Sequence, residues 1–463
     1  MFSAETYRER RAALRERVGS GLILLPGNGE SPANYPNNSY PFRQDSTFLY
    51  FCGLNRPGFS ALIDADSGEE MLFGDDLTVN DIIWSGPQPT MAESGARAGV
   101  AQSFPSGRLD ERLAEALHKG RRIHFLPPYR AENKLRIASW LEMQPEAMEG
   151  RVSVELALAV VSLREAKSPD EIAEIEKACA TGYRMHTTAM RMCRPGATER
   201  EIAGAIEGIA LQEGAGVSFR PIVTQHGETL HNHDYGGTLR AGRMLLVDAG
   251  AETIENYCSD FTRTFPVNGK FTQQQKEIYE IVLAANNRAF ELSKPGILYR
   301  DIHLAALRVI AEGVRALGLM RGDVDEAVAA GAMTLFMPHG IGHQMGLDVH
   351  DMENIGEKYV GYDRETPRST ELGLSSLRMG RRLKPDFVMT VEPGIYFIPA
   401  WIAKWKNEGT GKPFINFDAL NAYLDFGGVR IEDNILITAS GNRMLGRERI
   451  PVTVEAIEEY MRG

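Results

Sequence analysis

Two domains of different class are expected in this chain: an N-terminal α/β domain, then a larger α+β domain with a mostly antiparallel sheet. Its 463 residues are too many for one ordinary hydrophobic core. The first part alternates helical patterns with short apolar runs, which is typical of α/β folds. The rest opens with several helix starts and continues in strand-like segments, which indicates helices packed on antiparallel strands.

In the N-terminal domain we expect helices at two segments and strands at four short apolar runs. The helices are Glu5–Val18 and Leu109–His118, and the strands are residues 21–26, 48–51, 61–63 and 123–126. The alternation ends near Val160 or Val161. The predicted domains are therefore residues 1–161 and 162–463.

Three capping boxes mark helix starts in the second domain. In each, a Ser or Thr precedes a Glu or Gln by three residues, so side chains and backbone satisfy each other's donors. The boxes begin at Ser168, Thr198 and Thr272, and the last helix is expected to reach about Leu292. Residues 388–391 and 429–438 are predicted strands, and the polar, turn-rich residues 354–373 are a predicted loop.

Charge and composition exclude several classes of partner. A formal charge of -11 argues against nucleic acid or an anionic membrane, because both call for clustered Lys and Arg. The four cysteines lack the paired spacing of a disulfide framework or a cysteine zinc site. The N-terminus is charged where a signal peptide would be apolar, and no apolar run is long enough to span a bilayer. These features predict a soluble protein of the reducing cytoplasm.

The segment from Leu245 to Thr272 carries two aspartates on what are predicted to be paired strands. Asp248 ends an apolar run, and Asp260 precedes the alternating residues 261–265 on the return strand. Two buried carboxylates close together are costly unless a cation compensates them. The pair therefore predicts a metal site, for which the rest of the chain must supply further ligands.

Further ligand candidates lie in motifs of the same domain: PHGIGHQMGLDVHD with His343, TVEPGIYF with Glu392 and FGGVRIEDN with Glu432. With the two aspartates they make four carboxylates and one imidazole. The four negative charges of the carboxylates balance two divalent cations. So much oxygen favours a hard cation such as Mn2+, although Co2+ or Zn2+ could be accepted. Two ions a few ångströms apart can ionise a water for hydrolysis.

These motifs resemble those of the pita-bread metallopeptidases, in the branch that holds prolidase (Xaa-Pro dipeptidase) and aminopeptidase P. The family's DAG, [GS]D-[FI]-T-R-T, HGxxH, VEPG and RIED patterns are all matched. The resemblance implies a catalytic domain with a curved, mostly antiparallel sheet and two metals. It assigns Asp248 to one metal, His343 and Glu392 to the other, and Asp260 and Glu432 to both. The hairpin ETIENYCSD looks one residue longer than in many relatives, which predicts a longer turn or a bulge.

The resemblance also implies roles for five other side chains. His231, in TLHNHD, corresponds to a histidine near the scissile carbonyl, and His350 to a second histidine that lines the substrate pocket. His339 would support His343 or the substrate. Arg430 is expected beside the carboxylates, on the strand face of Glu432. Arg378 resembles the prolidase arginine that holds a dipeptide's free carboxylate.

We therefore expect hydrolysis of the Xaa-Pro bond in small proline-containing peptides, with dipeptides preferred because of Arg378. Glu392 is the expected proton carrier, and His231 and His350 would stabilise the oxyanion or position the proline. The close alternative is aminopeptidase P activity on longer Xaa-Pro peptides, and the remote one is a metal-free pita-bread binding module. The resemblance further implies a homo-oligomer, dimer or tetramer, whose small domain helps to close the site.

Other chemistries fit the sequence less well. His339 and His343 are four residues apart, as in helical zinc motifs, but Gly340 and Gly342 disfavour a helix. A two-His, one-carboxylate iron site at residues 231–234 would leave the other ligands unexplained, so His233 and Asp234 are interpreted as loop groups. Nothing near Cys258 marks a base that would make it a nucleophile.

Overall fold

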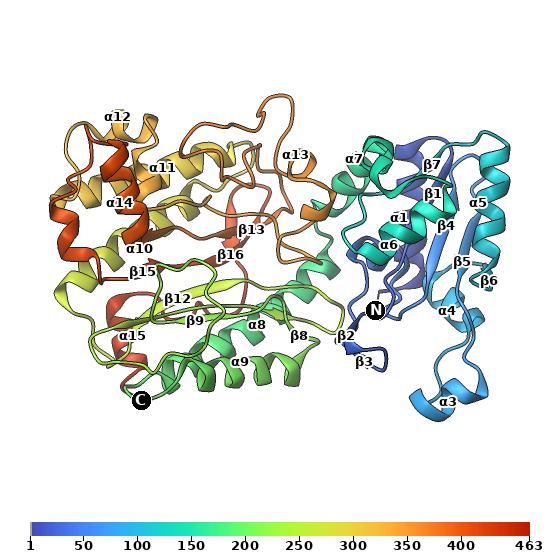
Figure 1. Cartoon of the computed structure of the whole chain (residues 1–463), viewed down its shortest axis with the longest axis horizontal. Helices are drawn as coiled ribbons and strands as arrows, with labels where there is room; N and C mark the ends of the chain where they lie inside the picture. Colours follow the sequence, from blue (N-terminus) through green and yellow to red (C-terminus); the bar gives the residue numbers. More distant parts are fainter. Residues whose placement is uncertain (1) are drawn as a thin grey trace. The chain divides into compact units, whose positions relative to one another are not determined.

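The computed structural model describes residues 2–463. The chain divides into two compact units. The first runs to Arg164 and includes the segment Met352–Tyr359. The second comprises Glu165–Asp351 and Val360–Gly463 (Figure 1).

The first unit is built on a mixed sheet of five strands. Its strands are β1 (Leu22–Pro26), β4 (Ser60–Asp64), β5 (Glu70–Phe73), β6 (Gln102–Phe104) and β7 (Ile123–His124). They lie in the order β6-β5-β4-β1-β7, with β1–β7 and β5–β6 parallel and the other two pairs antiparallel. A separate hairpin joins β2 (Pro32–Tyr35) and β3 (Asn38–Ser39). The helices are α1 (Ala4–Val18), α2 (Ser46–Cys52), α3 (Val79–Ser85), α4 (Met91–Ala98), α5 (Arg108–His118), α6 (Ala131–Trp140) and α7 (Val154–Arg164).

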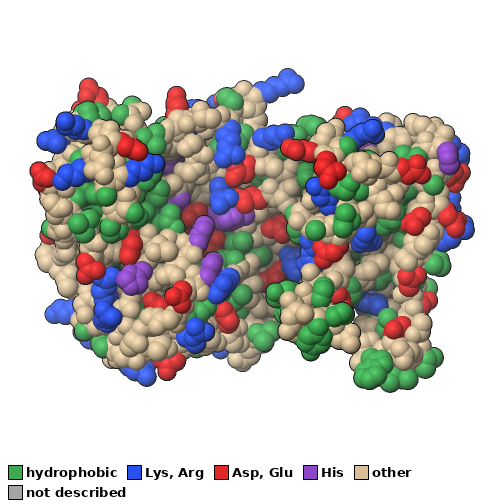
Figure 2. All heavy atoms as spheres, viewed as in Figure 1, with side chains coloured by type: hydrophobic (Ala, Val, Ile, Leu, Met, Phe, Trp, Pro, Cys, Tyr) green, Lys and Arg blue, Asp and Glu red, His purple; other side chains and the backbone are tan. Residues whose placement is uncertain are grey.

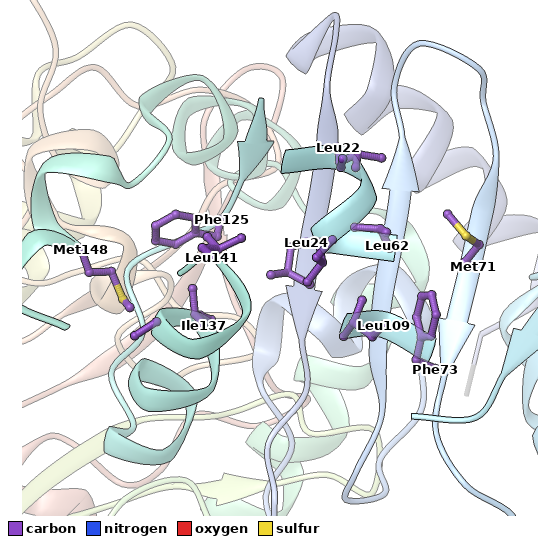
Figure 3. Close-up of a cluster of buried hydrophobic side chains, with 13 residues drawn as sticks. Leu22, Leu24, Leu62, Met71, Phe73, Leu109, Phe125, Ile137, Leu141 and Met148 are labelled. Carbon is purple, nitrogen blue, oxygen red and sulfur yellow. The ribbon is translucent and has the colours of Figure 1, made fainter. Parts of the chain in front are cut away.

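A cluster of buried apolar side chains joins this sheet to its helices (Figure 3). It includes Leu24 of β1, Leu62 of β4, Leu109 of α5 and Ile137 of α6, none more than 1% exposed. Burial of each such side chain contributes roughly 2 kcal/mol. The α/β class predicted for the N-terminal part is confirmed.

One strand prediction in this unit is wrong, because residues 48–51 lie in helix α2. The Asp45 side chain caps the helix by accepting a hydrogen bond from the Phe48 N–H at 2.9 Å. Gly53 ends it in the left-handed region, at φ 65°. Every residue of α2 is buried and residues 48–51 are all apolar, so this run has no periodicity to distinguish a helix from a strand.

The second unit opens with helices at the predicted places. All three capping boxes form, with side chain and backbone hydrogen-bonded in both directions. The helices are α8 (Pro169–Met192), α9 (Glu199–Glu213), α10 (Gln273–Leu292), α11 (Tyr299–Ala316), α12 (Val324–Ala329), α14 (Pro399–Glu408) and α15 (Val454–Tyr460). Helix α8 packs beside α9 and α10 beside α11 (Figure 1). No helix within residues 2–463 is long and apolar enough to cross a membrane.

The strands of the second unit form small antiparallel sheets. They are β8 (Gly216–Val217), β9 (Ile222–Thr224), β10 (Met244–Ala249), β11 (Ala251–Glu252), β12 (Phe261–Pro266), β13 (Val388–Val391), β14 (Gly394–Tyr396), β15 (Gly428–Arg430), β16 (Asp433–Ile437) and β17 (Asn442–Met444). Their orders are β12-β10-β9, β11-β8, β13-β16-β17 and β14-β15. Single bridges, such as Thr262 with Glu432, link one sheet to the next. Helices packed on antiparallel strands were predicted here and are found.

The predicted strand over residues 429–438 is interrupted at one of the candidate ligands. Ile431 N–H donates to the Pro393 carbonyl at 3.2 Å, whereas Glu432 N–H donates to the Thr262 carbonyl at 3.0 Å. The chain thus changes partner strand between β15 and β16, and Glu432 lies at the junction. Residues 354–373 are mainly loop, as expected, apart from the short helix α13 (Glu357–Val360) and part of a 3-10 turn.

Candidate functional site

The hairpin of β10 and β12 places both aspartates on one face. Asp248 pairs with Thr262 in the register, and Asp260 precedes Thr262 by two residues. Because strand side chains alternate between faces, these three side chains point the same way. The intervening turn contains Asn256 in the left-handed region, at φ 67°, which Asn tolerates better than most residues. The longer hairpin therefore does not turn Asp260 away from Asp248.

His343 reaches the carboxylates from a separate loop. Its Nε2 lies 3.4 Å from Asp260 Oδ2 and 3.8 Å from Glu392 Oε1. Its Nδ1 lies 2.9 Å from the Gln344 carbonyl, which can only accept, so Nδ1 carries a proton. With the proton on Nδ1, Nε2 is the ring nitrogen that faces the carboxylates and would bind a metal. Ligand atoms of Asp260, His343 and Glu432 all lie within 4.8 Å of one another.

Three buried carboxylate oxygens in this cluster lack a hydrogen-bond partner anywhere in residues 2–463. They are Asp248 Oδ1, Asp260 Oδ1 and Glu432 Oε1. A buried carboxylate oxygen that has neither a hydrogen-bond partner nor a cation beside it lowers the stability of the folded protein. Three such atoms from three ligand candidates fit divalent cations, as does the oxygen-rich donor set.

The electrostatics of the cluster agree with a need for positive charge. Burial raises the pKa of Glu392 to about 7, even though His343 and Arg430 oppose the shift. Burial, with nearby carboxylates second, also raises the pKa values of Asp260 and Glu432 well above their usual range. The protein alone therefore disfavours full ionisation of these groups, and bound cations would reverse that preference.

A buried arginine and a threonine tie the carboxylates together. Arg430 forms an ion pair with Asp248, 2.5 Å from Nη2 to Oδ2, and donates from Nε to Thr262 Oγ1 at 3.1 Å. Thr262 in turn donates to Glu432 Oε2 at 2.8 Å. The predicted neighbourhood of Arg430 and the carboxylates is therefore found. Thr262 was not singled out from the sequence, although it alternates with Asp260 on the same strand face.

Arg430 also begins a hydrogen-bond chain that orients His339. Its Nη1 donates to the Tyr396 hydroxyl at 2.9 Å. His339 Nδ1 lies 2.8 Å from the Gly340 carbonyl and so carries the proton, which leaves Nε2 to accept from the Tyr396 O–H at 2.8 Å. Burial lowers the pKa of His339 to about 3, so this ring stays neutral.

Two buried asparagines fix the backbone on either side of the candidate ligands. Asn434 accepts from the Asp260 N–H at 3.0 Å and donates to the Asp260 carbonyl. Asn286 donates to the carbonyls of Val391 and Ile431, which directly precede Glu392 and Glu432, at 3.0 and 3.3 Å. These contacts replace ladder hydrogen bonds where the strands end. Sequence reasoning missed both residues, because only the folded chain brings each amide to its partner.

All ten residues proposed from the sequence line one cavity of about 380 Å³ within the second unit. They are Asp248, Asp260, His343, Glu392, Glu432, His231, His339, His350, Arg378 and Arg430. The rings of His343 and His350 meet edge to face with centroids 4.2 Å apart. Burial, and then Arg430, lowers the pKa of His231. Figure 2 shows histidine, acidic and basic side chains close together on the surface of the second unit.

The structure also shows the surroundings of His233 and Cys258. His233, interpreted as a loop group, also lines the cavity. Cys258 is buried, and its thiol lies near the main-chain carbonyls of Asn256 and Leu347, at 4.0 and 3.7 Å. A thiol held against carbonyl oxygens is not activated as a nucleophile.

Comparison with known proteins places this site in context. Residues 173–439 match metallopeptidase family M24, and residues 7–124 match the N-terminal domain of aminopeptidase P. The Xaa-Pro aminopeptidase of Escherichia coli K12 is 31% identical over 469 residues, which cover 98% of each chain.

Solved structures resemble the chain over its whole length. The low-pH form of E. coli aminopeptidase P has a TM-score of 0.83 at 30% identity and covers 100% of this chain and 99% of its own. Zinc-substituted E. coli aminopeptidase P in complex with product has a TM-score of 0.81 at 29% identity, with the same coverage. The pita-bread class expected from the sequence motifs is thereby confirmed.

Proposed function

Because this chain belongs to metallopeptidase family M24 and carries an N-terminal domain of the aminopeptidase P type, we propose that it is a Xaa-Pro aminopeptidase. It releases the N-terminal residue from peptides whose second residue is proline. The convergence of two aspartates, two glutamates and a histidine, with three unpaired buried oxygens, supports a metallopeptidase, and the relatives named Xaa-Pro aminopeptidase favour this choice of substrate. The enzyme is a metallopeptidase, as expected from the sequence.

The dipeptide preference expected from Arg378 gives way to this alternative. Arg378 lines the cavity, but the relatives that cover the chain are named Xaa-Pro aminopeptidases. A guanidinium in the cavity can hold a carboxylate at either distance from the scissile bond. The residue alone therefore does not favour the shorter substrate.

We propose that Asp248, Asp260, His343, Glu392 and Glu432 hold two divalent cations, Mn2+ in preference to Co2+ or Zn2+ because four of the ligands are carboxylates. Asp248 would bind one ion, His343 and Glu392 the other, and Asp260 and Glu432 both. When bound, such ions polarise the scissile carbonyl and lower the pKa of water.

The other side chains would bind the peptide and move protons. Glu392 would take a proton from water and return it to the leaving nitrogen, since its carboxylate lines the cavity among the proposed ligands. That nitrogen belongs to proline and has no N–H, so no acceptor is needed for it in the bound substrate. His231 and His350 line the cavity, where they would donate to the developing oxyanion or pack on the proline ring. His339 is oriented to act beside them by Tyr396.

Three further expectations stay predictions: a cytoplasmic location, a homo-oligomer, and closure of the site by the N-terminal domain. Each can be measured on the purified enzyme or in cells.

The test of function is product analysis with the Mn2+-loaded protein on Leu-Pro, Leu-Pro-Leu and Leu-Ala-Leu. We expect free leucine and Pro-Leu from the second peptide, and little or no product from the others. Exclusive cleavage of Leu-Pro would restore the dipeptidase assignment. Protein that takes up no Mn2+ and cleaves none of the three peptides would instead support the metal-free binding module.

A further inference from the structure

Arg220 lies at the cavity beside the candidate metal cluster and has no assigned role. Arg220 is exposed, and the preceding residue, Phe219, also lines the cavity. One guanidinium N–H donates to the His233 carbonyl at 2.8 Å, and the group lies over the Tyr235 ring, 5.5 Å from its centroid. Tyr235 is itself fixed, since its hydroxyl donates to the Pro221 carbonyl at 2.5 Å. The guanidinium is thus held in place by neutral groups.

Arg220 makes no ion pair with any carboxylate in residues 2–463. An arginine presents five N–H donors in a planar fork that matches a carboxylate. The hydrogen bond to the His233 carbonyl uses one of these donors, and the side chain lines the cavity. By contrast, Arg430 in the same cavity donates its guanidinium N–H groups to Asp248, Thr262 and the Tyr396 hydroxyl.

The charge balance of the cavity leaves a requirement for an anion. Its lining contains four carboxylates, all of them proposed ligands, and three arginines, Arg220, Arg378 and Arg430. Two divalent cations would cancel the four carboxylates. Arg220 then has no carboxylate of the lining to pair with, and a peptide that enters the cavity is the natural source of a compensating carboxylate.

We propose that Arg220 forms a carboxylate-binding subsite for the end of the substrate that leaves with proline, and that it binds the C-terminal carboxylate of short Xaa-Pro peptides. This proposal rests on the proposed aminopeptidase function. An added residue moves the terminal carboxylate by about 3.3–3.6 Å along an extended chain. A dipeptide and a tripeptide therefore present their carboxylates to different parts of the cavity. An acidic third side chain offers the same chemistry from a second source.

The test compares Leu-Pro-Leu, Leu-Pro-Leu-amide and Leu-Pro-Glu-amide as substrates of the Mn2+-loaded enzyme and of Arg220→Gln. In the wild type the free acid should have a kcat/KM about tenfold above that of the amide, because the amide loses a charge-assisted hydrogen bond that is partly screened at this exposed site. In Arg220→Gln the ratio should fall to about one, through KM rather than kcat. If the glutamate side chain is the carboxylate that Arg220 recognises, only Leu-Pro-Glu-amide will lose activity.

Arg240→Gln is the matched control, since Arg240 is an exposed arginine of the same region that does not line the cavity. It should leave the acid-to-amide ratio unchanged. The proposal would be overturned if Arg220→Gln kept the wild-type kcat/KM ratio of Leu-Pro-Leu to Leu-Pro-Leu-amide and also the wild-type ratio of Leu-Pro-Glu-amide to Leu-Pro-Leu-amide.

A binding measurement separates this proposal from the proposed function. Calorimetry with the product-like Pro-Leu and Pro-Leu-amide reports on the subsite whether or not the protein cleaves peptides. Tighter binding of the acid that Arg220→Gln abolishes would support the subsite even if no tripeptide were hydrolysed. Equal binding of acid and amide by the wild type would contradict it even if the aminopeptidase assignment holds.

Discussion

Replacement of Asn434 by leucine should weaken metal binding without touching any proposed ligand. The Asn434 amide makes two hydrogen bonds to the backbone of Asp260 and is completely buried. Leucine has a similar size and neither donor nor acceptor, so it leaves the Asp260 N–H and carbonyl unpaired. Each unpaired buried group costs about 1–3 kcal/mol, so the variant should lose about 2–6 kcal/mol of stability unless the backbone moves. Movement of Asp260 would relieve this cost and displace the carboxylate.

We therefore expect the Mn2+ affinity of Asn434→Leu to fall about 10- to 100-fold, the usual effect of removing a group that orients a ligand. The assay is competition for Mn2+ with a fluorescent chelator, alongside thermal unfolding. Asn442→Leu is the matched control, because the Asn442 amide donates to the carbonyls of Phe290 and Ser293 at 2.6 and 2.7 Å. The control should lose stability and keep its Mn2+ affinity. An Asn434→Leu variant with wild-type affinity would refute the reasoning.

Three other perturbations should have measurable effects. Asp260→Asn removes a ligand charge and little volume, so peptide hydrolysis should drop to background with an unchanged circular dichroism spectrum; full activity would contradict a shared ligand. Since the pKa of Glu392 is about 7, Mn2+ must displace its proton, and affinity should fall by at least about a factor of ten per pH unit below 7 in calorimetric titrations; an affinity independent of pH between 5.5 and 7 would oppose this. Burial lowers the pKa of His186 to about 4, so the unfolded state binds the extra proton between pH 6.5 and 4, and stability should fall by roughly 3 kcal/mol as pH drops through that window. Denaturant melts of His186→Gln should show less of this loss than wild type, and an equal loss would count against it.

Helix starts were predictable because their signal is local. Ser168, Thr198 and Thr272 each form the expected capping box. The helix over residues 48–51 was not predictable, because a run of residues buried on every side has no hydrophobic period. The capping role of Asp45 became evident only in the structure. The change of partner strand at Glu432 likewise depends on a contact with Thr262, which lies 170 residues away in the chain.

The candidate site shows the same division. Asp248, Asp260 and the other ligands could be proposed because they lie in compact sequence motifs. Asn434 and Asn286 could not, because their function is to hold backbone groups that only the fold brings within reach. The preferred substrate length was not predictable from Arg378, because one arginine near a cavity does not give its distance from the scissile bond.

The most direct test of the central claim is an anomalous difference map from crystals of the protein grown with Mn2+. We predict two peaks a few ångströms apart, about 3.5–4 Å as in other two-metal sites, one against Asp248 and one against His343, with Asp260 and Glu432 between them. A single peak, or peaks away from these side chains, would contradict a two-metal site at this cluster.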